Sequence, residues 1–263
     1  MVEKLFEELS EIPEVEAIAL GGSRTGNEYD EKSDYDVYLY CTGNVNIDIR
    51  KTILSKYCDV MELGNQFWEY EDNCVLKNGV DIDILYRNIK DFGNDVASVV
   101  EGCQGRNGYT TCMWHNLSTC KVLYDENNRL TELKERFNVP YPLELKKNII
   151  ERNMLLLEDG LPAYKTQILK AVGRGDRNSV IHRSAGFFES YFDIVFALNE
   201  MTHPGEKRLA SICEKQCKIL PEDFKKNLDE YYENMFKDKC AIECTLEKIV
   251  RNLKKVVDNS KNW

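Results

Sequence analysis

The sequence has little histidine, no long apolar run and no excess of basic residues. Only three histidines are present, His115, His182 and His203, so a histidine-centred mechanism is not the first expectation. No apolar run approaches the roughly 20 residues that a membrane-spanning helix needs. The first 16 residues predict an acidic amphipathic helix, unlike a signal peptide with its basic start and apolar core. These absences predict a cytoplasmic protein without a membrane segment.

The negative charge of the chain is unevenly distributed. The formal net charge is −10 over 263 residues. Residues 1–140 hold 26 acids against 14 lysines and arginines, whereas residues 141–263 hold 19 against 21. The acidic half repels a polyanion and attracts metal ions or a cationic acceptor. We therefore expect no general nucleic-acid groove, while a local basic patch for the end of an RNA stays open.

Ten cysteines are expected to be reduced thiols in a cytoplasmic protein. Two pairs with i,i+4 spacing on predicted helices, Cys213/Cys217 and Cys240/Cys244, leave a four-thiolate zinc site open. The alternative is that these cysteines pack as small apolar residues, because structural zinc ligands come more often from short turns.

Residues 21–40 (GGSRTGNEYDEKSDYDVYLY) are the most informative segment. Residues 15–20 (VEAIAL) predict a buried strand, so Gly21 and Gly22 fall where the chain turns and where backbone N–H groups can approach an anion. Ser23 adds a hydroxyl. In the strand that follows, alternation puts Asp34 and Asp36 on one face. The segment predicts a phosphate site beside two carboxylates.

A second acidic strand follows a predicted hairpin turn at residues 78–79 (Asn-Gly). Alternation over residues 80–86 places Asp81 and Asp83 together, opposite Ile82 and Ile84. Carboxylates, water and substrate phosphates are the ligands that Mg²⁺ prefers, and two such ions can clamp an in-line phosphoryl displacement. The chain therefore predicts magnesium-dependent nucleotide chemistry.

The pattern GGS, SDYD and IDILYR resembles the nucleotidyltransferase superfamily related in fold to DNA polymerase beta. That superfamily includes the aminoglycoside and lincosamide nucleotidyltransferases, and the segments HRSAGFFESYFDIVFALN and HPGEKRL are similar to a related uncharacterised bacterial branch. The resemblance, strongest over residues 18–87, implies that Gly22 and Ser23 hold the β- and γ-phosphates. It also implies that Asp34 and Asp36 bind metal and that Asp83 is the third acid, with Asp81 as its rival.

The chain is predicted to divide at residues 138–142, where two prolines interrupt helical patterning. Residues 1–139 predict a mixed α/β (α+β) nucleotidyltransferase domain: helices over 2–11, 48–58 and 88–101, strands over 15–20 and 34–41, and the hairpin ending at 86. Residues 140–263 predict a helical bundle that binds nucleotide and acceptor, with helices over 143–157, 163–173, 179–199, 206–217 and 221–257. The last helix carries one apolar stripe: Ile242, Leu246, Ile249, Leu253 and Val256.

Positive charge for a triphosphate has to come from elsewhere in the chain. Arg24 directly follows the glycine pair. Further candidates surround a predicted helix start capped by Asp176 or Asn178: Lys170, Arg174, Arg177 and Arg183. The alternative is a helix–helix turn with a solvated charged rim.

Residues 105–116 (GRNGYTTCMWHN) carry glycines and aromatic rings after the second acidic strand. Tyr109, Trp114 and His115 are predicted to line an acceptor pocket, with Trp114 as a core residue the alternative.

Together these features predict transfer of a nucleoside monophosphate, AMP from ATP or another NTP, to a hydroxyl of a small-molecule, antibiotic-like acceptor. Pyrophosphate is released, and Asp83 or Asp81 accepts the proton. Two alternatives stay open: a toxin–antitoxin type enzyme acting on a protein or an RNA 3′ end, and a nucleotide-binding regulator without catalysis. A homodimer is also left open.

Overall fold

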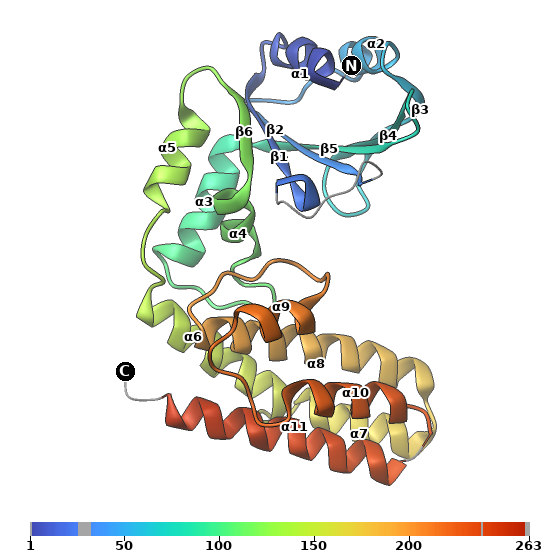
Figure 1. Cartoon of the computed structure of the whole chain (residues 1–263), viewed down its shortest axis with the longest axis vertical. Helices are drawn as coiled ribbons and strands as arrows, with labels where there is room; N and C mark the ends of the chain where they lie inside the picture. The colour runs from blue at the N-terminus through green and yellow to red at the C-terminus, as the bar shows by residue number, and fades with distance from the viewer. Residues whose placement is uncertain (1, 26–32, 238, 261–263) are drawn as a thin grey trace. The chain divides into compact units, whose positions relative to one another are not determined.

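The computed structural model describes residues 2–25, 33–237 and 239–260, without the side chains of Ser23 and Thr25 (Figure 1). The chain forms two compact units. The first contains residues 1–97 and 116–139, and the second contains residues 98–115 and 140–263. The predicted boundary between residues 139 and 140 is thus one of three points at which the chain crosses between units, and residues 98–115 belong with the helical part.

The first unit is built on a six-stranded mixed sheet with the order β3-β4-β5-β2-β1-β6. The central pair, β2 and β5, is parallel, and every other neighbouring pair is antiparallel. The strands are β1 Val15–Gly21, β2 Tyr35–Cys41, β3 Cys58–Asn65, β4 Glu71–Leu76, β5 Asp81–Asn88 and β6 Lys121–Asp125. The predicted strands and hairpin are present, and β3 and β6 are additions that the sequence did not predict.

One face of this sheet carries the hydrophobic core of the first unit. Helices α1 (Val2–Ser10) and α2 (Ile47–Leu54) cover it (Figure 1). Leu5 of α1 packs there with strand residues that point to the same face, among them Ile18, Leu39 and Ile84, all fully buried. The predicted alternation in β2 is confirmed, because Val37, Leu39 and Cys41 enter this core and Asp36 does not. The other face carries Asp36 together with the buried rings of Tyr38 and Tyr40.

A buried ion pair joins α2 to strand β4 of the sheet. Arg50 Nη1 lies 2.8 Å from Asp72 Oδ1, and neither side chain is exposed to solvent. Asp72 also accepts hydrogen bonds from the Gly64 N–H and the Tyr86 hydroxyl, both at 2.8 Å. Burial raises the pKa of Asp72 in spite of these partners. The cluster holds β3, β4 and β5 in one arrangement.

The remaining helices of this part follow the second acidic strand. They are α3 Ile89–Val100, α4 Cys112–Thr119 and α5 Arg129–Arg136. Helices α3 and α4 each contain a point at which the chain changes units. None of the helices in the described ranges is long and apolar enough to span a membrane.

The second unit is helical, as predicted. It contains α6 Leu143–Met154, a π-helical turn at Leu155–Asp159, α7 Tyr164–Arg174, α8 Arg177–Leu198, α9 Leu209–Gln216, α10 Phe224–Asn234 and α11 Lys239–Asn259. The predicted single helix over residues 221–257 is wrong, because α10 ends at Asn234 and α11 begins at Lys239. The predicted stripe is buried in α11 except at its last position, where Val257 is buried and Val256 is half-buried.

Candidate active site

Three predicted site residues lie side by side at the centre of the sheet. Gly21 of β1 pairs with Asp36 of β2, and Asp36 pairs with Asp83 of β5 in parallel register. Partners in register point to the same face, and neighbouring strands are about 4.8 Å apart. The fold therefore brings Asp36 and Asp83 together from positions 47 residues apart in the sequence.

The glycine pair is required by the side chains of β2. Gly22 has a φ of +62°, and a Cβ there would lie 1.7 Å from Asp36 Oδ2. A Cβ on Gly21 would lie 2.2 Å from Tyr38 Cε2. The carboxylate of Asp36 is thus seated directly against the turn that follows β1. Any larger residue at position 22 would displace it.

Arg24 contacts the residues at the start of β2. Its Nε donates to the carbonyls of Ser33 at 2.8 Å and Asp34 at 3.1 Å, and its guanidinium lies 3.7 Å from the centre of the Tyr35 ring. These contacts fix the chain where β2 begins. The side chain of Ser23 and the intervening residues 26–32 lie outside the described part of the chain.

Asp34 and the two acids of β5 are placed differently from one another. Asp34 precedes β2 and is half-buried. Asp83 is half-buried and accepts a 2.8 Å hydrogen bond from Asn73 Nδ2, and Asn73 accepts one of 2.7 Å from Asn65. Asp81 is exposed at the start of β5. The hydrogen-bonded row across the sheet therefore consists of Asn65, Asn73 and Asp83, and it does not include Asp81.

Two residues of β4 on this face were missed in the sequence. Asn73 pairs with Asp83, and Glu71 lies diagonally from it, opposite Leu85. Glu71 is buried. Burial, followed by the charge of Asp83, raises the pKa of Glu71. Alternation would have found both residues, since Cys74 and Leu76 of the same strand point into the core.

The same face is closed beyond Tyr38. Arg87 binds Glu69 through two hydrogen bonds of 2.7 and 2.8 Å and lies 4.1 Å from the centre of the Tyr38 ring. The ring of Tyr40 contacts Phe92 of α3 edge-on at 5.1 Å. Burial raises the pKa of Tyr38, with the Arg87 charge opposing it. The carboxylates therefore stand at the accessible end of an otherwise filled face.

The donor set suits a magnesium ion that arrives with a nucleotide. Within residues 2–25, 33–237 and 239–260, no group of three or more His, Cys, Asp or Glu side chains is arranged to hold a metal. Asp36 and Asp83 offer two carboxylates in register. Mg²⁺ is usually bound by one or two carboxylates together with substrate phosphates and water, so this pair fits such an ion.

The predicted basic residues lie in the second unit, whereas the predicted carboxylates lie in the first. Lys170 and Arg174 are exposed on α7, and Arg183 is half-buried on α8. The predicted cap of α8 is Asp176, whose carboxylate accepts hydrogen bonds from the N–H and hydroxyl of Ser179 at 3.1 and 2.7 Å. A phosphate contact from these residues stays a prediction.

The cysteine pairs form no zinc cluster among the described residues. Cys213 is buried and Cys217 half-buried, whereas Cys240 and Cys244 are exposed. The packing alternative therefore describes Cys213.

The loop over residues 105–116 divides between core and cavity. Trp114 is buried against Tyr141, with ring centres 5.5 Å apart, so the core alternative holds for it. Tyr109 lines a cavity. His115 Nδ1 is 2.7 Å from the hydroxyl of Thr202.

His203 is fully buried, and burial lowers its pKa to about 3. Its ring is therefore neutral at neutral pH.

Residues 2–104 match the family model described as "Nucleotidyltransferase domain". The match spans α1 to α3 and β1 to β5, and it contains the predicted glycines and carboxylates. No curated protein matches the chain.

Among solved structures, the chain is similar to a nucleotidyltransferase-like protein from Exiguobacterium sibiricum, with 10% identity and a TM-score of 0.44, covering 98% of this chain and 75% of that one. An aminoglycoside 6-adenyltransferase from Bacillus subtilis aligns with 10% identity and a TM-score of 0.28, covering 98% and 90%. A CCA-adding enzyme from Thermotoga maritima, complexed with tRNA, aligns with 13% identity and a TM-score of 0.30, covering 99% and 82%.

Proposed function

We propose, from the match of residues 2–104 to a nucleotidyltransferase domain, that the protein transfers a nucleoside monophosphate, AMP from ATP, to a hydroxyl of a small-molecule acceptor with release of pyrophosphate. The observation that carries the proposal is the register of Asp36 and Asp83 on the parallel pair β2 and β5, with Gly22 seated against Asp36. Two carboxylates beside a positive-φ turn suit a metal-bound triphosphate.

Each residue of the site has a proposed task. Asp36 and Asp83, with Asp34 from the segment before β2, would hold Mg²⁺, and two ions would neutralise charge on the reacting phosphate and the leaving pyrophosphate. Gly21, Gly22 and Ser23 bind the phosphate tail. Asn73 orients Asp83 through its 2.8 Å hydrogen bond.

The acceptor hydroxyl must lose its proton to a carboxylate of this face. Asp83 and Glu71 both lie on it, and Glu71 is the one that the proposed metal site does not use. Asp81 is less suited, because it is exposed at the start of β5. We assign proton acceptance to an oxygen of Glu71 or Asp83.

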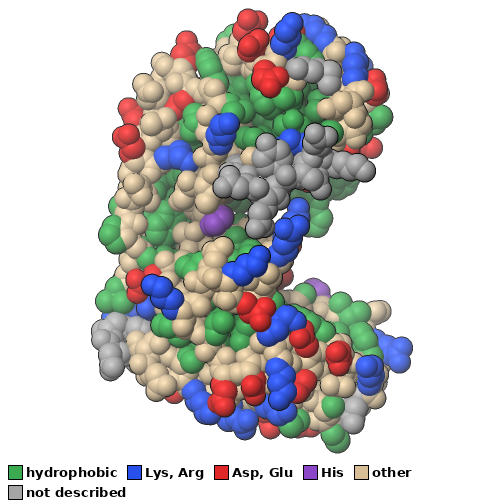
Figure 2. Space-filling view, in the orientation of Figure 1, with side chains coloured by type: hydrophobic (Ala, Val, Ile, Leu, Met, Phe, Trp, Pro, Cys, Tyr) green, Lys and Arg blue, Asp and Glu red, His purple; other side chains and the backbone are tan. Residues whose placement is uncertain are grey.

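Positive charge for the triphosphate comes from Lys170, Arg174 and Arg183, while Arg24 holds the start of β2. A small-molecule acceptor is favoured over a nucleic acid because the chain is acidic overall. Figure 2 also shows Lys and Arg side chains interspersed with Asp and Glu over the coloured surface of the second unit.

The test is a screen of the four NTPs with Mg²⁺ and the full chain against hydroxyl-bearing small molecules, following pyrophosphate and product mass. We expect pyrophosphate release that depends on ATP, acceptor and Mg²⁺ together. NTP binding without pyrophosphate release would instead assign a regulator. A mass increase on added RNA or protein alone would assign the toxin-type activity.

A further inference from the structure

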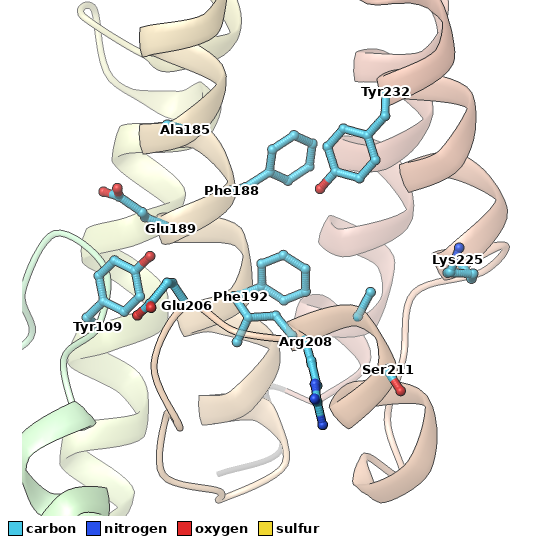
Figure 3. Close-up of a pocket in the computed structure, with 12 residues that line it drawn as sticks. Tyr109, Ala185, Phe188, Glu189, Phe192, Glu206, Arg208, Ser211, Lys225 and Tyr232 are labelled. Atoms are coloured by element: carbon cyan, nitrogen blue, oxygen red, sulfur yellow. The ribbon is translucent and has the colours of Figure 1, made fainter. Parts of the chain in front are cut away.

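The helical unit contains a cavity of about 610 Å³ that the proposed transfer reaction does not explain. Helix α8, the start of α9, α10 and the loop carrying Tyr109 line it (Figure 3). We call it the aromatic cavity, because its walls include Tyr109, Phe188, Phe192 and Tyr232. Its volume falls in the range of about 300–1,000 Å³ that is typical of small-molecule sites.

Two carboxylates stand at one end of the aromatic cavity. Glu189 and Glu206 lie beside Tyr109 (Figure 3). In the described part of the chain, neither makes a hydrogen bond or an ion pair. Burial, followed by the charges of Glu189 and Glu206, raises the pKa of Tyr109 to about 12. Unmatched negative charge next to aromatic rings attracts a cation.

The basic residues of the cavity do not neutralise this end. Lys225 is paired with Asp229 on its own helix, with its Nζ 2.6 Å from Oδ2. Arg208 is exposed, and Figure 3 shows its guanidinium pointing away from the Tyr109 ring. The charge that remains beside Tyr109 is therefore negative.

Tyr109 is held in an unfavourable backbone conformation. Its φ is +51°, a region that costs a non-glycine residue about 1–3 kcal/mol. Gly108 before it packs so tightly on α8 that a Cβ would lie 2.8 Å from Glu189 Cβ.

A buried hydrogen-bond network supports the same loop. Asp193 accepts hydrogen bonds from the N–H and hydroxyl of Thr110 at 3.1 and 2.6 Å, and Asn153 accepts one from the Gly108 N–H at 3.2 Å. A strained aromatic residue fixed beside two unmatched carboxylates is characteristic of a prepared binding site.

We propose that the aromatic cavity binds an organic cation: a small molecule with a protonated or quaternary amine on a flat apolar body. The amine lies between Glu189 and Glu206 against the Tyr109 ring, and the apolar body lies on Phe188 and Phe192. The assignment goes beyond the proposed transfer reaction and holds whether or not this ligand receives the nucleotidyl group.

The test measures binding to the full chain at pH 7.5 without nucleotide, by ligand-observed NMR. Three probes of similar size differ in charge: 2-phenylethylamine, 2-phenylethanol and phenylacetate. We expect the amine to bind about tenfold more tightly than the alcohol, equivalent to about 1.4 kcal/mol, and phenylacetate to bind least. Equal affinity for amine and alcohol, or preference for phenylacetate, overturns the proposal.

Conservative variants locate the site. Glu189→Gln and Glu206→Gln are each expected to weaken the amine several-fold and to leave the alcohol unchanged. Glu243→Gln, an exposed change on α11, is the matched control. An equal loss for amine and alcohol, or no loss in either cavity variant, contradicts the assignment. Because no nucleotide is present, these results are independent of the pyrophosphate assay.

Discussion

Asp36 is the single side chain on which the proposed reaction depends most, because its carboxylate lies against Gly22 and it pairs with Asp83. We expect Asp36→Asn to lower kcat by about 10²-fold or more, as does removal of one stabilising group at other active sites. Its melting temperature should stay close to that of the parent. Asp59→Asn, an exposed change on β3, is the control in the pyrophosphate assay. Full turnover of the Asp36 variant would refute the metal site.

Asp83 and Asp81 are distinguished by their surroundings. Asp83 is half-buried and bonded to Asn73, whereas Asp81 is exposed. Asp83→Asn should therefore reduce kcat far more than Asp81→Asn does. Steady-state kinetics of the two variants decide the order. A larger loss for Asp81→Asn would transfer the function to Asp81.

The sequence was sufficient to predict the sheet face on which some of these residues lie, because strand alternation is a local property. It predicted that Asp36 points away from Leu39, and the core confirms it. It did not predict that Asp72 is buried on the core face of β4, where it pairs with Arg50 of α2, 22 residues away in the sequence. Such pairing follows from the packing of elements and not from any local pattern.

The attachment of α2 to β4 rests on the Arg50–Asp72 pair. Asp72→Ala should lower the free energy of unfolding by about 3–5 kcal/mol, because Arg50 is left buried without its counter-charge. Burial already raises the pKa of Asp72, so the pair is held against a desolvation cost. The double variant Arg50→Met/Asp72→Leu should recover most of the loss in urea denaturation. A double variant as unstable as Asp72→Ala would contradict this account.

The attachment of the Tyr109 loop to α8 should depend on pH through Asp193. Burial raises the pKa of Asp193 from 3.8 to about 6. Between these values the folded state keeps a proton that the unfolded state has lost, so stability falls as pH rises from about 4 to about 6. Urea denaturation at pH 4.5 and 7 should show a loss of about 2 kcal/mol from this group. The Asp193→Ala variant should be less stable than the parent, and its stability should lack the part of the pH dependence that comes from Asp193. If the stability of the variant depends on pH in the same way as that of the parent, the assignment to Asp193 is wrong.

Helices and strands could be predicted where their apolar residues are regularly spaced. Residues 15–20 and 34–41 were found because apolar positions alternate or run together. The break between α10 and α11 was not found, because residues 235–237 (Met-Phe-Lys) contain neither proline nor glycine and the apolar stripe continues on α11. Strand β6, five residues long, offers too short a pattern.

Over the whole chain, charge separates the two units and predicts that tight nucleotide binding needs both. Residues 1–140 have a net charge of −12, and residues 141–263 have a net charge of +2. Arg174→Ala and Arg183→Ala should each weaken Mg-ATP binding by about 1.5–3 kcal/mol in calorimetry of the intact protein. Lys226→Ala, an exposed change on α10, is the control. Unchanged affinity in both arginine variants would leave the helical unit to acceptor binding.

The threefold passage of the chain between its units bears on how such proteins can be recombined. Because residues 98–115 sit with the helical part while the segments on both sides do not, no single cut separates the units. A chimaera that joins residues 1–139 of this chain to the helical part of a relative would combine that helical part with the Tyr109 loop of this chain. The loop would then be foreign to the helices on which it packs. Exchange of the whole helical unit between relatives therefore requires two inserts, residues 98–115 and the segment from residue 140 onward, transferred together.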